Sequence, residues 1–164
     1  MDSLFISSTI TKSVTIHPKH IDKNLDLTIL KKIKEEIEGK CIKNGYVKPG
    51  SIKILKKNLG DIQMGYFKGH IVYNVLISLD LCNPLENAVI EAQVINTNKM
   101  GVLAGVPNEQ VSPLNILLAR QHHVDNENFA NLKENDIINV KIVGKRYEFG
   151  DSQISIIGVL DTEN

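Results

Sequence analysis

A single helical period in an otherwise strand-like chain is the feature that most constrains the fold. Ile29, Ile33 and Ile37 recur every four residues between residues 24 and 38, and Gly39 follows where a left-handed cap commonly ends a helix. Elsewhere, short β-branched runs alternate with glycine and proline turns, and the helical period does not return strongly. The sequence therefore predicts one main helix packed against strands, followed by a region that is almost all β.

Two long strand-like segments accompany the helix in the first half of the chain. Residues 4–16 are rich in Ile, Val, Thr and Ser, which predicts one long strand or two short ones. Residues 71–81 alternate between apolar and mixed positions, so this strand should cover a core on one side. An Asn-Pro pair then ends the pattern. We place a domain boundary there, which gives an α+β domain over residues 1–82 and a second domain over residues 83–164.

The second domain reads as five short strands. A longer irregular connection, residues 120–134, separates the third strand from the fourth. Five strands with such a connection suit a small Greek-key OB barrel. The apolar segments that mark these strands are residues 88–95, 100–106, 114–119, 138–142 and 154–160.

Composition narrows the class of protein. The 164 residues are 42% hydrophobic and 23% charged, which is ordinary for a globular chain and unlike a disordered one. Apolar runs are only a few residues long, so we expect no transmembrane helix, and the first residues lack the pattern of a signal peptide. Cys41 and Cys82 are far apart in sequence and form no disulfide framework, which favours a reducing, intracellular setting.

Charge is distributed unevenly along the chain. Residues 1–82 carry 13 lysines and 8 acids, a net +5, whereas residues 83–164 carry 6 basic residues and 11 acids, a net −5. Between Gly39 and Gly60 there are lysines and no acids. This run is interpreted either as a solvated face or as a contact for an acidic partner, a protein surface or a nucleic-acid backbone. Its lysines are Lys40, Lys43, Lys48, Lys53, Lys56 and Lys57.

Catalytic motifs are missing from the sequence. The chain contains no phosphate-binding glycine loop and no nucleophile elbow, and its five histidines do not have the spacing of metal ligands. We therefore predict no catalytic residue, no metal and no cofactor, and a chain that is not an enzyme by itself.

The barrel region does carry side chains suited to single-stranded RNA. OB folds bind such strands with basic groups along the backbone and aromatic platforms for the bases. An equally weighted interpretation is that the aromatic residues close the barrel and the charges are only solvated. The candidate RNA-binding residues are Lys99, Arg120, His122, His123, Lys141, Lys145, Arg146 and Tyr147.

The order of these parts resembles the larger stalk subunit of archaeal, eukaryotic and large-DNA-virus RNA polymerases. The resemblance covers nearly the whole chain, and each short motif is weak alone but their shared order is more specific. Two departures are Asn87, where the family customarily has glycine, and the pair Val102 and Leu103, where it has two aromatic residues. The matching motifs are Ile16-His17-Pro18, Glu38-Gly39-Lys40-Cys41, Gly45-Tyr46, Asn83-Pro84, Met100-Gly101-Val102-Leu103-Ala104, Asn135-Asp136, Gly144-Lys145-Arg146 and Ile156-Ile157-Gly158.

The resemblance implies both a fold and a set of partners. It implies an α+β N-terminal domain, with a bent antiparallel sheet and one main helix, followed by an all-β OB-fold barrel. The first domain would dock on the polymerase core subunits through a tip loop and pair with a smaller helical stalk subunit, and the second would guide nascent single-stranded RNA. An alternative for the tip is an ordinary hairpin end that packs onto its own core. The tip maps to Leu59, Gly60, Ile62, Met64, Gly65 and Tyr66.

Three functions remain open at this level. The first is a non-catalytic stalk subunit of a multisubunit DNA-directed RNA polymerase, in a host cytoplasmic viral factory and the virion if viral, or in the nucleus if cellular. Enrichment in Lys, Asn and Ile makes us favour the viral version. The second is a free-standing OB-fold regulator that binds RNA without a polymerase. The third, least favoured, is a nuclease-like OB enzyme.

Overall fold

The computed structural model describes residues 4–62 and 69–162, and the chain forms two compact units. The first unit consists of Met1–Lys40 and Val47–Cys82, and the second of Cys41–Tyr46 and Asn83–Asn164. The domain boundary predicted from the sequence falls after residue 82, which places residues 41–46 in the first domain. In the structure these residues group with the barrel.

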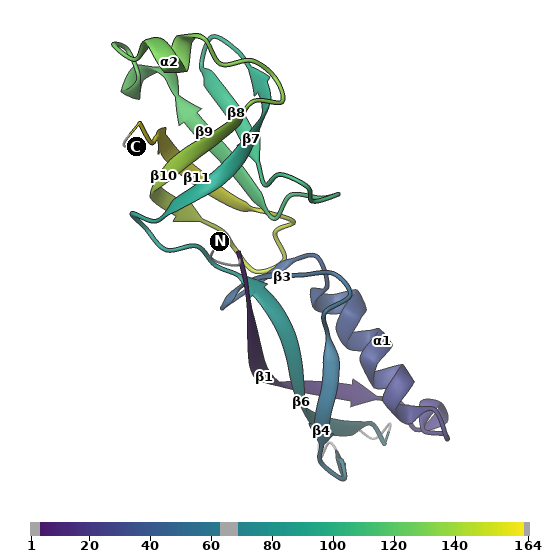
Figure 1. Ribbon diagram of the computed structural model, residues 1–164. Coiled ribbons are helices and arrows are strands. Elements are labelled where there is room, and N and C mark those ends of the chain that lie inside the picture. Colours follow the sequence, from purple (N-terminus) through teal and green to yellow (C-terminus); the bar gives the residue numbers. More distant parts are fainter. Residues whose placement is uncertain (1–3, 63–68, 163–164) are drawn as a thin grey trace. The chain divides into compact units, whose positions relative to one another are not determined.

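The first unit is an antiparallel sheet built around one long strand, β6 (Ile71–Cys82), with a single long helix, α1 (Leu25–Ile37). β1 (Phe5–Ile16) is one twelve-residue strand and pairs with β6 along its whole length. Figure 1 shows β1 bending sharply along its course. The shorter strands β4 (Lys53–Lys57) and β5 (Asp61–Ile62) also pair with β6.

The core of the first unit contains buried residues from both α1 and β6. The isoleucines of α1 are almost fully buried, at 0–1% exposure, and the predicted helix is confirmed with ends one residue inside the expected ones. Gly39 has φ +68°, the left-handed conformation expected after a helix end. Alternate residues of β6 point into the same core because side chains along a strand alternate between its faces. These buried β6 residues are Tyr73, Val75, Ile77, Leu79 and Leu81.

The second unit is a closed five-stranded barrel. The strand order is β10-β11-β9-β8-β7, and β7 pairs with β10 to close it. β11 and β9 run parallel, and the other neighbours are antiparallel. This is the predicted OB-fold barrel, and all five predicted strands are present. They are β7 (Val89–Thr97), β8 (Gly101–Gly105), β9 (Leu114–Ala119), β10 (Ile137–Arg146) and β11 (Ile154–Leu160).

The connection between β9 and β10 is more ordered than predicted. It contains a 3-10 turn, η2 (Arg120–His122), and a short helix, α2 (Glu127–Ala130). The side chain of Asn126 accepts a hydrogen bond from the Phe129 amide at 3.1 Å, which caps the first turn of α2. Phe129 is buried, so this segment has an apolar anchor that the sequence alone did not reveal.

A small hairpin follows α1, and its residues 41–46 belong to the second unit. β2 (Cys41–Ile42) pairs with β3 (Gly45–Val47). The Cys41 amide donates to the Asp151 carbonyl at 2.7 Å, and the Gly150 amide donates to the Cys41 carbonyl at 2.8 Å. The hairpin is therefore hydrogen-bonded to the loop between β10 and β11.

The described residues contain neither a helix suited to span a membrane nor a cluster suited to bind a metal ion. None of the helices within residues 4–62 and 69–162 is long and apolar enough to span a bilayer. Over the same ranges, no group of three or more His, Cys, Asp or Glu side chains is arranged to hold a metal ion.

Candidate functional site

OB folds bind oligonucleotides on the outer face of their second and third strands, here β8 and β9, and on the loops that correspond here to β7–β8 and β10–β11. β11 pairs with β9 and extends this face. Cross-strand registers align Leu103, Leu117 and Ile157 in one row across these three strands. Leu117 and Ile157 are 42% and 51% exposed, whereas Val102 points into the barrel and is 2% exposed. The centre of this face, which we call the barrel face, is therefore aliphatic and offers no aromatic platform in that row.

One end of the barrel face is the turn between β7 and β8. The side-chain oxygen of Asn98 accepts the amides of Met100 and Gly101, at 2.8 and 3.1 Å. The Arg120 guanidinium donates to the Asn98 carbonyl at 3.0 Å, and Lys99 lies exposed on the turn. Lys99 and Arg120, which are 21 positions apart in the sequence, therefore lie at one end of the barrel. His122 is also exposed and follows Arg120 within η2.

The other end of the barrel face has a polar row. Registers align Arg146 with Ser155, and Ser155 with Asn115, and all three side chains are exposed. Arg146 lies 3.8 Å from Glu148, and both side chains are largely exposed, so this ion pair holds the guanidinium only weakly. Lys141 is exposed on β10 opposite Val159, near the last residues of β11 and β9, so it lies toward the Arg120 end and not in this row. At about 3.3 Å per strand residue, the two ends are roughly 13 Å apart along β9.

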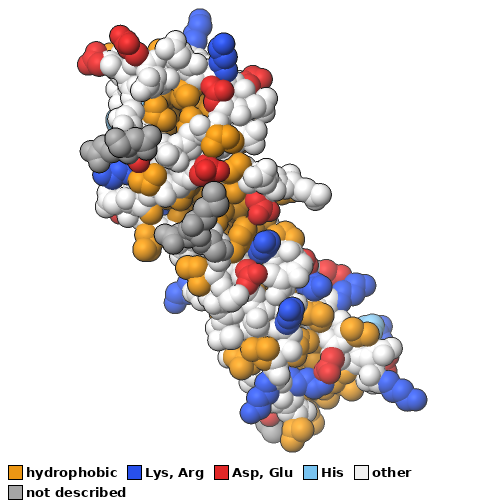
Figure 2. Space-filling view, viewed as in Figure 1, with side chains coloured by type: hydrophobic (Ala, Val, Ile, Leu, Met, Phe, Trp, Pro, Cys, Tyr) orange, Lys and Arg blue, Asp and Glu red, His pale blue; other side chains and the backbone are white. Residues whose placement is uncertain are grey.

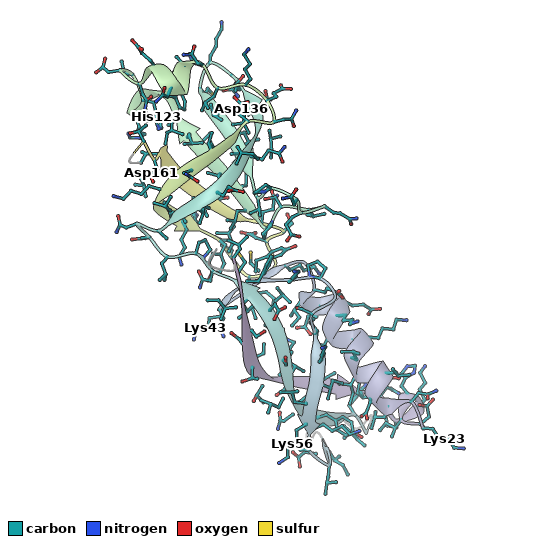
Figure 3. All side chains as sticks on the ribbon, viewed as in Figure 1. Lys23, Lys43, Lys56, His123, Asp136 and Asp161 are labelled. Carbon is teal, nitrogen blue, oxygen red and sulfur yellow. The ribbon has the colours of Figure 1, made fainter. Side chains whose placement is uncertain are left out.

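His123 has an internal role in the structure. It is 7% exposed, its ring stacks on Phe129 with centroids 4.2 Å apart, and it lies beside α2 in the barrel unit (Figure 3). Nδ1 donates to the Ala119 carbonyl at 2.8 Å, and Nε2 accepts the Leu160 amide at 2.9 Å. The carbonyl can only accept and the amide can only donate, which fixes the tautomer with the proton on Nδ1. The His123 ring therefore connects β9, β11 and α2 through these contacts.

Two further candidate residues also make internal contacts. The Lys145 ammonium donates to the Asn83 side chain at 2.5 Å and to the Pro84 carbonyl at 2.9 Å. The Tyr147 hydroxyl donates to the Lys43 carbonyl at 3.0 Å, and burial, with a smaller effect from a nearby cysteine, raises the pKa of this phenol. These side chains position backbone within the second unit. The structure therefore leaves Lys99, Arg120, His122, Lys141 and Arg146 as the exposed members of the predicted set.

Three members of the predicted tip fall within the described residues. Leu59 is fully exposed at 101%, and Ile62 is 72% exposed at the end of β5. Gly60 has φ +89°, and a Cβ added there would lie 2.6 Å from the Ile71 side chain and 2.8 Å from Tyr73. The chain therefore needs glycine where it passes over β6. Met64, Gly65 and Tyr66 lie outside the described residues.

The predicted run of six lysines is divided by the fold. Lys43 belongs to the second unit, and the other five belong to the first. Lys57 forms an ion pair with Asp26, and Lys48 lies 4.7 Å from the centre of the Phe5 ring. Lys53 and Lys56 are exposed on β4.

An apolar hollow adjoins these lysines on the first unit. Leu27 of α1 and Leu55 of β4 are 65% and 54% exposed, and they line a hollow of about 490 Å³ together with Leu30. In Figure 2, lysine and apolar side chains are intermixed over the face formed by α1 and β4. Apolar groups ringed by charge are typical of a protein contact surface.

Sequence reasoning missed the residues that shape the barrel face. Asn98 orders its turn through three hydrogen bonds, and Leu117 and Ile157 form its exposed centre. The strict alternation of Leu114–Ala119 was a usable signal, because every second residue of this strand must face outward.

An OB barrel preceded by a helix-and-sheet unit is the class of architecture that the resemblance predicted. No protein-family model matches the chain. Relatives with similar sequences are nevertheless found, and they are RNA polymerase subunits.

Three relatives define the similarity. A protein of Acanthamoeba polyphaga mimivirus, provisionally named as DNA-directed RNA polymerase subunit L376, is 21% identical over 96% of this chain and 82% of its own length. The RNA polymerase II subunit rpb7 of Dictyostelium discoideum is 26% identical over 72% of this chain and 64% of its own. Subunit RPB7 of Glycine max is 20% identical over 96% and 92%. Identity is low, but coverage of this chain reaches 96% for two of the three, so the comparisons support an RPB7-like RNA polymerase subunit and confirm the resemblance.

Proposed function

We propose that this chain is a non-catalytic stalk subunit of a multisubunit DNA-directed RNA polymerase, and that it works inside the cell in transcription. The first unit docks on the polymerase core through the tip and pairs with a smaller helical stalk subunit. The second unit guides nascent single-stranded RNA over the barrel face. For a viral chain the site of action is the cytoplasmic viral factory and the virion, and for a cellular chain it is the nucleus.

The observation that carries the proposal is the sequence similarity to RNA polymerase subunits, which covers 96% of the chain for two of the relatives. Two surfaces fit the proposed contacts. Leu59 and Ile62 expose apolar side chains next to the glycine turn of the tip, and exposed apolar groups are the usual anchors of a protein interface. The apolar hollow between α1 and β4 offers a separate surface for the smaller subunit.

The barrel face suits weak, sequence-tolerant contact with RNA. Its basic groups lie at its two ends, where they can meet successive phosphates, and its centre is aliphatic. Without aromatic stacking in that row, most of the affinity must come from the phosphate contacts, which are sensitive to salt. Such contact fits a guide along which the transcript slides.

Co-purification tests the docking half of the proposal. The tagged full-length chain, expressed in its native source, should bring down the large polymerase subunits. The double substitution Leu59→Asp and Ile62→Asp should abolish this, because each places a charge in an apolar contact. A control with Leu85→Asp, which is 72% exposed in the other unit, should retain the complex. A wild-type chain that purifies alone, yet binds RNA, would instead support the free-standing regulator.

RNA binding by the full chain tests the second half. Lys99→Gln together with Arg146→Gln removes one exposed charge from each end of the barrel face. If each contacts one phosphate, the slope of log affinity against log salt should fall by about 1.4, since each single-strand contact contributes about 0.7. Lys133→Gln, on the β9–β10 connection, is the matched control. An equal loss in the control would place the RNA elsewhere.

A further inference from the structure

Three histidines meet at the far end of the β1–β6 pair, in the first unit. The last register pair of these strands is Ile16 with Ile71, so His17 and His70 lie next to each other just beyond it. Their ring centroids are 5.1 Å apart with an edge-to-face angle of 84°. Gly69, which immediately precedes His70, has φ +67°, a left-handed conformation that glycine adopts readily.

The third histidine returns to the same place through the 3-10 turn η1 (Pro18–His20). The His20 amide donates to the His17 carbonyl at 2.9 Å, and the two rings lie 6.2 Å apart. His17 Nδ1 accepts the Lys19 amide at 3.2 Å, so the neutral His17 ring carries its proton on Nε2. The turn therefore holds the cluster through backbone hydrogen bonds.

Helix α1 adds two lysines to the same hollow. The Lys32 ammonium donates to the carbonyl of Thr15, and Lys31 lies 4.0 Å from Glu35 one turn further along the helix. Lys31 and Glu35 are 80% and 68% exposed, so their pairing is weak and both remain open to other partners. The histidines and these α1 side chains line a hollow of about 610 Å³, which we call the histidine hollow.

The charges of the histidine hollow are one-sided. Its titratable lining groups are the three histidines, Lys31, Lys32 and Glu35, so five nitrogen bases face one carboxylate. An ammonium group only donates hydrogen bonds, and a neutral imidazole donates from one ring nitrogen, which suits a ligand that presents acceptors. A phosphate group presents several oxygen acceptors and negative charge, and its bonds to charged donors are short and strong. The volume also fits a small phosphate-bearing molecule.

We propose that the histidine hollow binds a phosphate group, with His17, His20, His70 and Lys31 as its donors. The site is in the first unit and shares no residue with the barrel face or the tip, and it does not depend on the role in a polymerase. The phosphate comes either from a free nucleotide or from the backbone of a nucleic acid.

Titration of the full-length chain with inorganic phosphate tests the proposal, followed by NMR of the histidine ring protons. We expect saturable shifts of the His17, His20 and His70 signals, with Kd on the order of 1 mM. His123, whose two ring nitrogens are both hydrogen-bonded inside the barrel unit, is the internal control and should not shift in parallel. Non-saturating shifts, or equal shifts of His123, would overturn the proposal.

Variants locate the site and separate the sources of phosphate. His70→Gln should abolish saturation, and Lys31→Gln, a surface change that leaves the fold intact, should weaken binding about threefold to fivefold. Lys23→Gln is the matched control and should have no effect. AMP, used in place of phosphate, tests binding of a terminal phosphate, and the dinucleotide ApA tests binding of a backbone diester. Saturable binding of either supports the site and shows which of the two kinds of phosphate it takes. Saturation by Zn²⁺ with no response to phosphate would overturn the proposal in favour of a metal site.

Discussion

Replacing His123 by alanine should destabilise the barrel more than any other single change to a candidate RNA-binding residue. The ring joins three elements, because it is bonded to the end of β9, bonded to the end of β11, and stacked on the only buried side chain of α2. Alanine removes both hydrogen bonds and the stacking at once. It also leaves the Leu160 amide, which is only partly exposed, without its acceptor.

The size of the effect can be worked from these contacts. Two hydrogen bonds contribute about 1 kcal/mol each, and the stacked pair contributes about 0.5–1.5 kcal/mol. The expected loss is therefore about 3 kcal/mol, a large part of the roughly 5–15 kcal/mol that stabilises a typical domain. With a urea m-value of about 1.5 kcal/mol/M, the unfolding midpoint of the barrel should fall by about 2 M.

Urea unfolding, followed by amide hydrogen exchange, measures the free energy of unfolding of each unit separately. Amides of β11, above all that of Leu160, should lose protection in His123→Ala. The substitution His123→Phe keeps a ring to stack on Phe129 but has no nitrogen, so it should recover only the stacking part. His122→Ala, one residue away and exposed, should stay within about 0.5 kcal/mol of wild type. If the two alanine variants unfold at the same urea concentration, the structural role argued for His123 is refuted.

Three further predictions concern glycine and cysteine. Gly101→Ala puts a Cβ 2.1 Å from a backbone carbonyl oxygen of β9 and should cost more than about 2 kcal/mol in urea unfolding, while Gly144→Ala, with open space, should cost little. Gly60→Ala should destabilise by about 1–3 kcal/mol more than Gly50→Ala; both have positive φ, but only Gly60 would clash with β6, so equal losses would contradict the clash. Burial, with a smaller effect from a nearby aspartate charge, raises the pKa of Cys41 from 9.0 to about 11. As the pH rises, the Cys41 thiol loses its proton in the unfolded chain before it does so in the folded one, so the free energy of unfolding should decline between about pH 9 and 11. At pH 8, alkylation of Cys41, located by mass spectrometry, should occur only after urea is added.

Much of the fold was readable from local periodicity. The isoleucines of α1 and the alternating residues of β6 and the barrel strands are buried as their spacing predicted, because a side chain's face follows from its position along a helix or strand. Asn87 is instructive in a different way. It has φ +65°, so asparagine keeps the left-handed turn where the family customarily has glycine.

The remainder depended on pairing between distant segments. The 41–46 hairpin is held by a loop about a hundred residues later, which no local pattern reports. His123 sits in a polar loop sequence and reads as an exposed basic group, yet its partner is the amide of Leu160, 37 positions away. His17 and His70 likewise meet only through the register of β1 with β6. Residue types alone gave the candidates, and the register decided which of them lie together.

The grouping of residues 41–46 with the barrel has a practical and a biosynthetic consequence. The polypeptide crosses between its two units three times, after residues 40, 46 and 82, so a single cut after residue 82 releases the five barrel strands without the 41–46 hairpin. A fragment starting at Asn83 would leave the amide of Gly150 and the carbonyl of Asp151 to water. On the ribosome, the hairpin emerges about a hundred residues before residues 147–151, and it stays unpaired with them until they have been made. The second unit is therefore complete only when both of its segments, residues 41–46 and residues 83–164, are present in the same protein.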